Sequence, residues 1–327
     1  MSDLPYDRLQ VSAPFTFTGM DVFGPFLVTD GKTTRKNASS KKTWAIVFTC
    51  LVSRAVHIEP LPSLDISCFK NALRRFFCLR GTCHKLRCDQ GTNFIGAQGQ
   101  DALLPLEELK SDPNFHNIEW EFNPPKASHF GGAWERKISS IKRILDASLL
   151  QLKSQNLSRD EFHTFLSEAS SIINNTPLWE ISHSPSDPFP LTPAMLLFTT
   201  PEPNPPPLES FSSSDILCYG SRRWRRVQSL SDQFWSRWRQ HHMQNFLTRK
   251  KWHQEKRSVK IGDIVLMKDK GLKRNAWPLA RVIDTKCSSD GLVRTVTLLI
   301  PSRSSKSRTC SLTRPISEII MIHKIES

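Results

Sequence analysis

Residues 15–21, Phe-Thr-Phe-Thr-Gly-Met-Asp, alternate apolar and polar side chains and predict a β-strand at the start of the fold. The run Thr43-Trp-Ala-Ile-Val-Phe-Thr-Cys-Leu-Val52 is almost wholly apolar, which is typical of a buried strand. Ala55-Val-His-Ile-Glu-Pro60 follows after a short turn and predicts a third strand. Together they predict a sheet whose first strand contains Asp21 among apolar neighbours.

Helices and further strands follow these three strands. From Asp65 to Leu79 the apolar residues recur on one helical face, and Asp65 is a suitable N-cap. Strands are predicted at Lys85–Asp89 and Asn117–Phe122, and helices from near Gly132 and over about Ser158–Asn174. This order predicts an α/β domain, in which helices cover a mixed sheet.

The last third of the chain has a different pattern. Residues 222–257 contain no Gly or Pro, are rich in Arg, Lys and Trp, and predict a basic helix. Residues 258–327 contain short alternating segments separated by Gly, Asn and Asp, which predict a small all-β barrel. A Pro- and Ser-rich stretch predicts a linker. The predicted domains are residues 1–200, the linker 201–221, the helix 222–257 and the barrel 258–327.

Composition excludes several classes of protein. A hydrophobic content of 38% with 9 Trp and 19 Phe argues against global disorder. The sequence has no apolar run of membrane-spanning length and no signal peptide pattern, and its eight scattered Cys are unlike a secreted disulfide framework. The net charge of +14 comes from the last third: residues 1–150 carry +4, residues 151–220 carry −6 and residues 221–327 carry +16. This distribution favours a polyanionic partner for the last third.

Three acidic residues are candidates for chemistry: Asp21 inside the first strand, Asp89 at the end of the fourth and Glu135 in the first turn of a helix. A carboxylate in an apolar strand is costly unless it is paired or binds a metal. Three carboxylates brought together by a sheet would suit a hard cation such as Mg²⁺. Taken singly, however, Asp89 is also suited to a turn and Glu135 to a helix N-terminus, and spacing alone leaves both readings open.

Three motifs surround these acids: Gly19-Met-Asp-Val-Phe-Gly-Pro-Phe26, Arg87-Cys-Asp-Gln-Gly-Thr-Asn-Phe-Ile-Gly-Ala97 and Pro124-Pro-Lys-Ala-Ser-His-Phe-Gly-Gly-Ala-Trp-Glu-Arg136. They closely resemble the catalytic core of retroelement integrases, above all those of the BEL/Pao retrotransposon lineage. The resemblance continues through Asn174-Asn-Thr-Pro-Leu178 and into the C-terminal segments Val259-Lys-Ile-Gly-Asp-Ile-Val-Leu266 and Trp277-Pro-Leu-Ala-Arg-Val282. It therefore spans nearly the whole chain.

The resemblance implies an RNase H-like mixed sheet with flanking helices, and an SH3-like barrel preceded by the basic helix. It implies that Asp21, Asp89 and Glu135 form a DDE triad for two Mg²⁺ or Mn²⁺ ions, with Asp21 and Asp89 at the first ion and Glu135 joining Asp21 at the second. The implied activity is polynucleotidyl transfer, namely 3′-end processing of element DNA and strand transfer into target DNA. A homo-oligomer that binds DNA in the nucleus, and is also present in the cytoplasm, is expected.

The sequence departs from the family pattern in three ways. The spacing of 45 residues between Asp89 and Glu135 is longer than in retroviral integrases. Thr176 stands where family members often carry Arg. The His-His-Cys-Cys zinc module that normally precedes the core is absent, because no Cys precedes Cys50 and no His precedes His57. No structural zinc is therefore expected, and the chain resembles a truncated or separately encoded piece of a polyprotein.

Further residues are candidates for contacts with DNA. In the core these residues lie near the predicted acids, and in the basic segment they alternate with Trp. The same residue types also occur in turns and on solvated surfaces that bind no DNA, so that alternative stays open. Cys78, Cys83, His84 and Cys88 lie close together but lack paired metal-binding spacing, which favours buried thiols over zinc. The predicted DNA contacts are Asn93, Lys126, His129, Arg223, Arg225, Arg226, Lys250 and Lys251.

Two other functions share these features. A catalytically idle, nucleic-acid-binding relic of a retrotransposon would keep the same triad and basic segment, and the missing zinc module favours it somewhat. An RNase H-like nuclease that cuts RNA in hybrids would share the fold and the metals, but the motifs around the acids do not support it. Integrase-type DNA integration is the prediction that accounts for most of the sequence.

Overall fold

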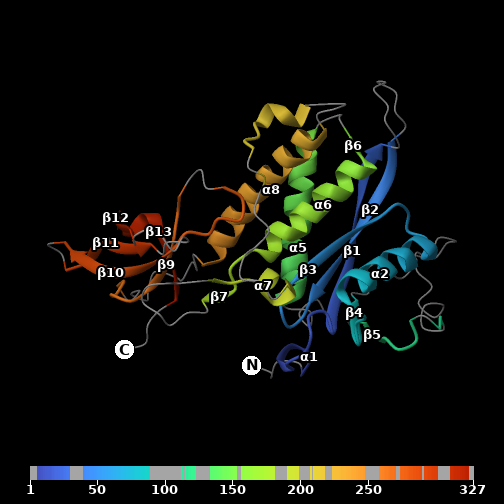
Figure 1. The fold of residues 1–327 in the computed structure, drawn as a ribbon, viewed down its shortest axis with the longest axis horizontal. Coiled ribbons are helices and arrows are strands. Elements are labelled where there is room, and N and C mark those ends of the chain that lie inside the picture. Colours follow the sequence, from blue (N-terminus) through green and yellow to red (C-terminus); the bar gives the residue numbers. More distant parts are fainter. Residues whose placement is uncertain are drawn as a thin grey trace. The chain divides into compact units, whose positions relative to one another are not determined.

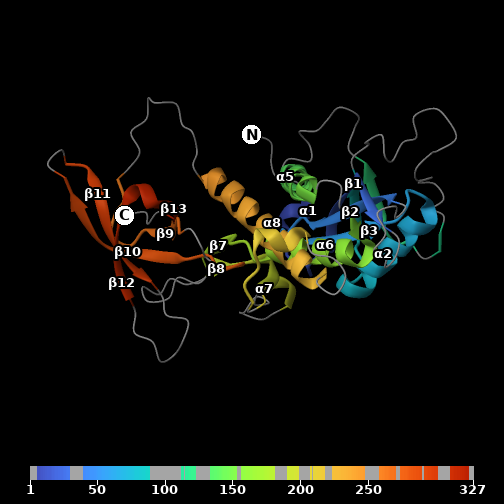
Figure 2. The same cartoon turned by 90° about the horizontal axis from the view of Figure 1, so that it is seen from above.

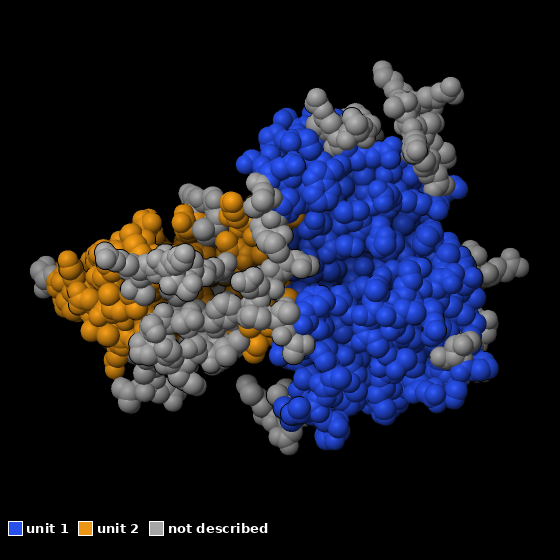
Figure 3. All heavy atoms as spheres, in the orientation of Figure 1, with its two compact units in different colours: residues 1–174, 196–200, 207–235 blue, residues 175–195, 201–206, 236–327 orange. Residues whose placement is uncertain are grey.

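The structure is a computed structural model of the 327-residue chain. It divides into two compact units, the first formed by residues 1–174, 196–200 and 207–235 and the second by residues 175–195, 201–206 and 236–327 (Figure 3). Among the described residues, no helix is both long and apolar enough to cross a membrane. The residues that the structure describes are 6–29, 40–88, 112–113, 115–122, 133–152, 156–180, 190–198, 207, 209–217, 223–246, 258–269, 273–288, 291–300 and 310–323.

The first unit is built on a mixed sheet. Its strands are β1 (Phe17–Thr29), β2 (Ser40–Cys50), β3 (Val56–Leu61), β4 (Lys85–Cys88), β5 (Glu119–Phe122) and β6 (Leu157–Ser158). They follow the order β3-β2-β1-β4-β5, with β6 beside the far end of β1 (Figure 1). Within this order β2 runs in the opposite direction to the other four strands. This is the RNase H-like mixed sheet that the sequence predicts.

Helices cover both faces of this sheet (Figure 1). On one face, α2 (Ile66–Arg80) packs into a core in which the rings of Phe48 and Phe76 stack at 4.1 Å. On the other face lie α5 (Ala133–Leu149) and α6 (Arg159–Asn174), and Phe162 of α6 contacts Phe26 of β1. Successive residues of β1 alternate between the two faces, which is why a polar Asp21 fits between the buried Met20 and Val22.

Side-chain caps explain where two of these helices begin. The Asp65 Oδ1 accepts a hydrogen bond from the Cys68 backbone N–H, 2.8 Å away, at the start of α2. Ser158 and Glu161 form a reciprocal capping box at the start of α6, in which each side chain accepts from the backbone N–H of the other residue. Both helices therefore begin where the sequence predicts.

The side chain of Asn174, the last residue of α6, holds the edge strand β3. Its Oδ1 accepts from the Val56 backbone N–H at 2.7 Å, and its Nδ2 donates to the Val56 carbonyl oxygen at 2.8 Å. A single buried amide thus satisfies both backbone polar groups of Val56, the first residue of the strand.

We expect Asn174→Ala to lower the free energy of unfolding by about 1–3 kcal/mol, because it leaves buried backbone groups without partners. Urea denaturation followed by far-UV circular dichroism measures this loss. Asn156→Ala is the control, because it removes an exposed amide that bonds only the Ser40 hydroxyl in the described contacts. The control should change stability by less than about 0.5 kcal/mol, and equal losses in the two variants would contradict the prediction.

The second unit carries an antiparallel sheet. Its strands are β9 (Ile264–Met267), β10 (Leu279–Cys287), β11 (Val293–Ile300), β12 (Cys310–Pro315) and β13 (Ile319–His323). They follow the order β12-β11-β10-β9-β13, and the 3-10 turn η4 (Ile316–Glu318) joins the last two in the chain (Figure 2). The C-terminal part of the chain is therefore all-β, as predicted. Its core contains Val265, Met267, Ala280, Val282, Val296, Leu298 and Ile319.

The basic segment forms α8 (Arg223–Phe246), whose residues belong to both units. In the first unit its Phe234 ring meets Phe165 of α6 edge to face. In the second unit its Trp238 Nε1 donates to Thr176 Oγ1 at 2.8 Å, which gives a structural role to the Thr that replaces Arg. Residues 223–235 of α8 belong to the first unit and residues 236–246 to the second, and residues 247–257 lie outside the described residues. The domain limits of the sequence analysis stay a prediction.

Short elements complete the described parts of the chain. They are α1 (Tyr6–Leu9), η1 (Leu150–Leu152), β7 (Trp179–Glu180), β8 (Pro190–Leu191), α7 (Pro193–Phe198) and η2 (Ser213–Leu217).

Candidate active site

Asp21 lies in β1 at the point where the neighbouring strand β4 ends. The last register pair between these parallel strands joins Met20 to Cys88, one residue before Asp21 and one residue before Asp89. The strand order reverses between β1 and β4, because β2 and β3 lie on one side of β1 and β4 and β5 on the other. Open α/β sheets bind ligands outside the carboxyl ends of strands at such a switch point. The fold therefore places Asp21 where a ligand site is expected.

The Asp21 carboxylate is partly buried and is paired with an ammonium group. Its side chain is 23% exposed, and Lys142 of α5 donates from Nζ to Asp21 Oδ2 over 2.5 Å. The same Nζ lies 3.5 Å from the Val22 carbonyl oxygen and 5.8 Å from the centre of the Phe23 ring. A carboxylate removed partly from water is costly unless a positive charge compensates it. This position of β1 therefore accommodates a cation.

Helix α5 carries the position of the third predicted acid and contacts β1 through Lys142. The helix begins at Ala133, two residues before Glu135, and Lys142 anchors it to β1. Seven residues are about two helical turns, so position 135 and Lys142 share one face of α5. The side chain of Glu135 and the whole of Asp89 lie outside the described residues. Of the three predicted catalytic carboxylates, the structure describes that of Asp21.

Burial and charge shift two pKa values on α5. Lys137 donates from Nζ to the Arg54 carbonyl oxygen. Burial of this amine, assisted by the charge of the Arg54 guanidinium, lowers the pKa of Lys137 to about 7, although part of the residue stays exposed. One turn beyond Lys142, burial raises the pKa of Asp146, and the Lys142 charge partly offsets this rise. In both residues of α5 the pKa is shifted in the direction that favours the uncharged form.

Ion pairs fix β4 just before Asp89. Arg87 donates from Nε to Asp7 Oδ2 over 2.5 Å, and its Nη2 lies 3.1 Å from Glu121 Oε1 on β5. These contacts join β4 to α1 and to β5, while the backbone pairing of β4 with β1 places Arg87 opposite Gly19. They fix the Arg87 side chain two residues before Asp89.

Lys142, Arg87 and Asp7 are not among the site residues predicted from the sequence. The spacing of seven residues from Glu135 to Lys142 is a helical signal that could have identified Lys142. No local pattern connects Asp7 to Arg87, because 80 residues separate them. That contact depends on the tertiary fold.

Of the three predicted metal ligands, the one whose side chain the structure describes, Asp21, has the chemistry that a hard divalent cation requires. Asp21 supplies carboxylate oxygens, the ligand type that Mg²⁺ and Mn²⁺ prefer, in a position that already holds a positive charge. Across the described residues, no group of three or more His, Cys, Asp or Glu side chains is arranged to hold a metal ion. Asp89 and Glu135 stay predicted ligands.

The predicted thiol cluster is partly confirmed. Cys83 and Cys88 are buried, and burial raises the pKa of Cys83 to about 12, so it is a thiol at neutral pH. Cys78, in contrast, is exposed on α2. The sequence predicts that Cys78 is buried, but it lies outside the buried face of α2, which consists of Phe69, Ala72, Leu73, Phe76 and Phe77.

The other predicted DNA-contacting residues have different placements. Asn93, Lys126, His129, Lys250 and Lys251 lie outside the described residues. Arg223 is half-buried in the first turn of α8.

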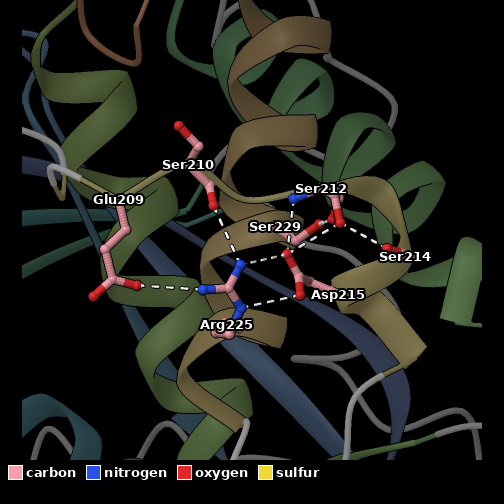
Figure 4. A network of polar contacts seen from close by, with 7 residues as sticks. All are labelled: Glu209, Ser210, Ser212, Ser214, Asp215, Arg225 and Ser229. Atoms are coloured by element: carbon pink, nitrogen blue, oxygen red, sulfur yellow. Dashed lines mark hydrogen bonds and ion pairs between the residues drawn. The ribbon is translucent and has the colours of Figure 1, made fainter.

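Arg225 is the centre of a polar network within the first unit (Figure 4). Its guanidinium donates to both carboxylate oxygens of Asp215, at 3.1 and 3.2 Å, and also to the Ser210 carbonyl oxygen at 3.3 Å. These bonds, with the Ser212 backbone N–H, lower the pKa of Asp215 to about 2. The network attaches residues 209–217 to α8, so this part of the predicted linker is fixed within the first unit.

Arg226 is buried, at odds with the predicted contact to DNA. Its side chain is 3% exposed, and its Nη1 lies 3.4 Å from Glu161 Oε1, on a carboxylate that is 4% exposed. Its Nε donates to the Ile216 carbonyl oxygen at 3.0 Å. The guanidinium thus joins α8 to the capping box of α6 and to η2, and it is not offered to solvent.

Comparisons with known proteins found one family model and a set of solved structures. Residues 222–322 match a family of unknown function, DUF5641. No curated protein sequence matches the chain. Among the solved structures that match the chain, three serve as examples, with TM-scores of 0.37, 0.33 and 0.34. One is the simian T-cell lymphotropic virus intasome in complex with PP2A regulatory subunit B56 gamma, at 13% identity and TM-score 0.37, covering 96% of this chain and 81% of that chain.

The other two solved structures are retroviral catalytic cores. The HTLV-2 integrase catalytic core domain in complex with magnesium is 18% identical at TM-score 0.33, and the match covers 57% of this chain and 97% of that chain. The catalytic core domain of BIV integrase is 17% identical at TM-score 0.34, and the match covers 57% of this chain and 95% of that chain.

Proposed function

We propose that the chain is a DDE polynucleotidyl transferase of the retroelement integrase type, of BEL/Pao lineage, which processes 3′ ends of element DNA and joins them to target DNA. One observation carries the proposal. The motif residue Asp21 lies at the switch point of an RNase H-like sheet, where β4 ends one residue before Asp89 and α5 packs on β1 with position 135 on the contacting face. The motifs around all three acids support the same assignment.

In this proposal the carboxylates of Asp21 and Asp89 hold one divalent ion, and Glu135 with Asp21 holds a second. Two Mg²⁺ or Mn²⁺ ions would supply charge stabilisation for the attacking and leaving oxygens at a phosphodiester. The protein's own part is to fix these oxygen ligands on a rigid sheet and helix, which the Arg87 ion pairs and the Lys142 contact support.

DNA is the proposed partner, and the basic C-terminal third is its proposed binding region, acting in a nuclear homo-oligomer. Because Arg225 and Arg226 bond within the protein, we assign the phosphate contacts to exposed cations of the second unit. Lys260 and Lys273 are exposed there. Binding through phosphates should weaken strongly as salt rises and depend little on base sequence.

A strand-transfer assay with a labelled duplex oligonucleotide tests this function. We expect nicking and joining by the full chain in Mg²⁺ or Mn²⁺ and none in EDTA, and we expect Asp89→Asn to abolish both. Metal-independent DNA binding without any nicking or joining would instead support a catalytically idle relic. Equal activity of Asp89→Asn and the wild type would overturn the assignment of the triad.

A further inference from the structure

The ion pair between Lys142 and Asp21 has a consequence for metal binding. The pair joins α5 to β1 across 121 residues of sequence, and both side chains are partly buried, at 28% and 23% exposure. The Lys142 ammonium therefore compensates a carboxylate that has lost part of its water. It does so at the oxygen Oδ2, one of the two oxygens that Asp21 can offer to a metal.

The Lys142 ammonium and a divalent cation are drawn to the same single negative charge. A cation bound to the Asp21 carboxylate at about 2.0–2.6 Å would lie close to the ammonium, and the two positive charges would repel each other. We propose that Lys142 is the internal counter-ion of Asp21 and yields Oδ2 when a divalent cation binds, so that the ion pair and the metal compete. This inference rests on the proposed function, because it takes Asp21 to be a metal ligand.

The surroundings of Lys142 allow it to leave Asp21. Its four-carbon side chain is flexible, and the Asp146 carboxyl lies one turn further along the same helix. The Lys142 charge already acts on Asp146, where it offsets part of the effect of burial on the pKa. Asp146 is thus a second carboxylate that can receive the ammonium after its release.

Binding of Mn²⁺ to the full-length protein, measured by isothermal titration calorimetry, tests the competition. We expect Lys142→Gln to bind Mn²⁺ about fivefold more tightly than the wild type. A fivefold change in affinity corresponds to about 1 kcal/mol, the free energy that a partly exposed ion pair contributes. Lys142→Arg, which keeps the charge, should stay close to the wild type. Arg143→Gln removes the same charge from the neighbouring, exposed position of α5 and should change the affinity less than Lys142→Gln.

Thermal unfolding gives a second measurement, independent of activity. In EDTA, Lys142→Gln should melt below the wild type, because Asp21 has lost its counter-ion. In saturating Mn²⁺ the two proteins should melt at the same temperature, because the ion pair is broken in both. A residue with a purely structural role would lower the melting temperature equally with and without Mn²⁺, and that result would overturn the inference.

The same measurements distinguish a failure of the Lys142 competition from a failure of the proposed metal site. If Asp21→Asn removes Mn²⁺ binding while Lys142→Gln leaves the affinity unchanged or weaker, the competition is wrong and the metal site stands. If neither the wild type nor Lys142→Gln binds Mn²⁺, both the metal site and the competition are overturned.

Discussion

Asp21→Asn is expected to reduce metal-dependent nicking and joining of DNA by on the order of 10³-fold or more, which corresponds to about 4 kcal/mol of transition-state stabilisation. The amide keeps the shape of the side chain but lacks the negative charge that both proposed metal ions share. Single-turnover rates on a labelled oligonucleotide, at saturating Mg²⁺, measure the loss.

The control for this prediction is Asp160→Asn, which removes an exposed carboxylate from the first turn of α6. It should leave the rate within about twofold of the wild type, since surface changes far from a site act weakly. Circular dichroism should show that Asp21→Asn keeps the fold. A folded Asp21→Asn protein with the wild-type rate would contradict the assignment of Asp21.

Arg226→Met is expected to cost about 3–5 kcal/mol of the free energy of unfolding, because it leaves the Glu161 carboxylate buried without its cation. The same change removes the hydrogen bond from Arg226 Nε to the Ile216 carbonyl oxygen. Chemical denaturation monitored by circular dichroism measures the loss. The effect should be on stability and not on the salt dependence of DNA binding, which is the effect expected of a phosphate contact.

Two further variants separate this explanation from a general effect of charge on α8. Arg223→Met removes a half-buried cation from the first turn of the same helix and should cost less than about 1 kcal/mol. Adding Glu161→Gln to Arg226→Met removes the stranded charge while keeping an oxygen for the Ser158 backbone N–H, and should recover part of the loss. Weaker DNA binding with unchanged stability in Arg226→Met would contradict the buried ion pair.

Local patterns in the sequence predicted the elements of the fold well. The alternation around Asp21, the apolar run after Thr43 and the caps at Asp65 and Ser158 each depend on neighbouring residues, and the corresponding strands and helices are present. The mixed α/β class and the all-β C-terminal part follow from the order of these elements.

Tertiary contacts limited the predictions for individual charged residues. Arg225 and Arg226 lie in a strongly basic stretch, and composition cannot distinguish a cation that meets DNA from one that pairs with Asp215 or Glu161. The same limit applies to Lys142, whose partner lies 121 residues away. The composition of residues 201–221 predicts a linker, because no local sequence pattern indicates that the Arg225 side chain bonds to Ser210 and Asp215.

The central claim is that Asp21, Asp89 and Glu135 converge on bound metal ions. Fe²⁺ takes oxygen-rich sites of divalent cations, and with ascorbate and peroxide it cuts the polypeptide close to where it is bound. In the full-length protein we predict three clusters of cuts, near residues 21, 89 and 135, which excess Mg²⁺ suppresses and Asp21→Asn removes together. Cuts that avoid any one of these three segments, or that persist in Asp21→Asn, would contradict the account.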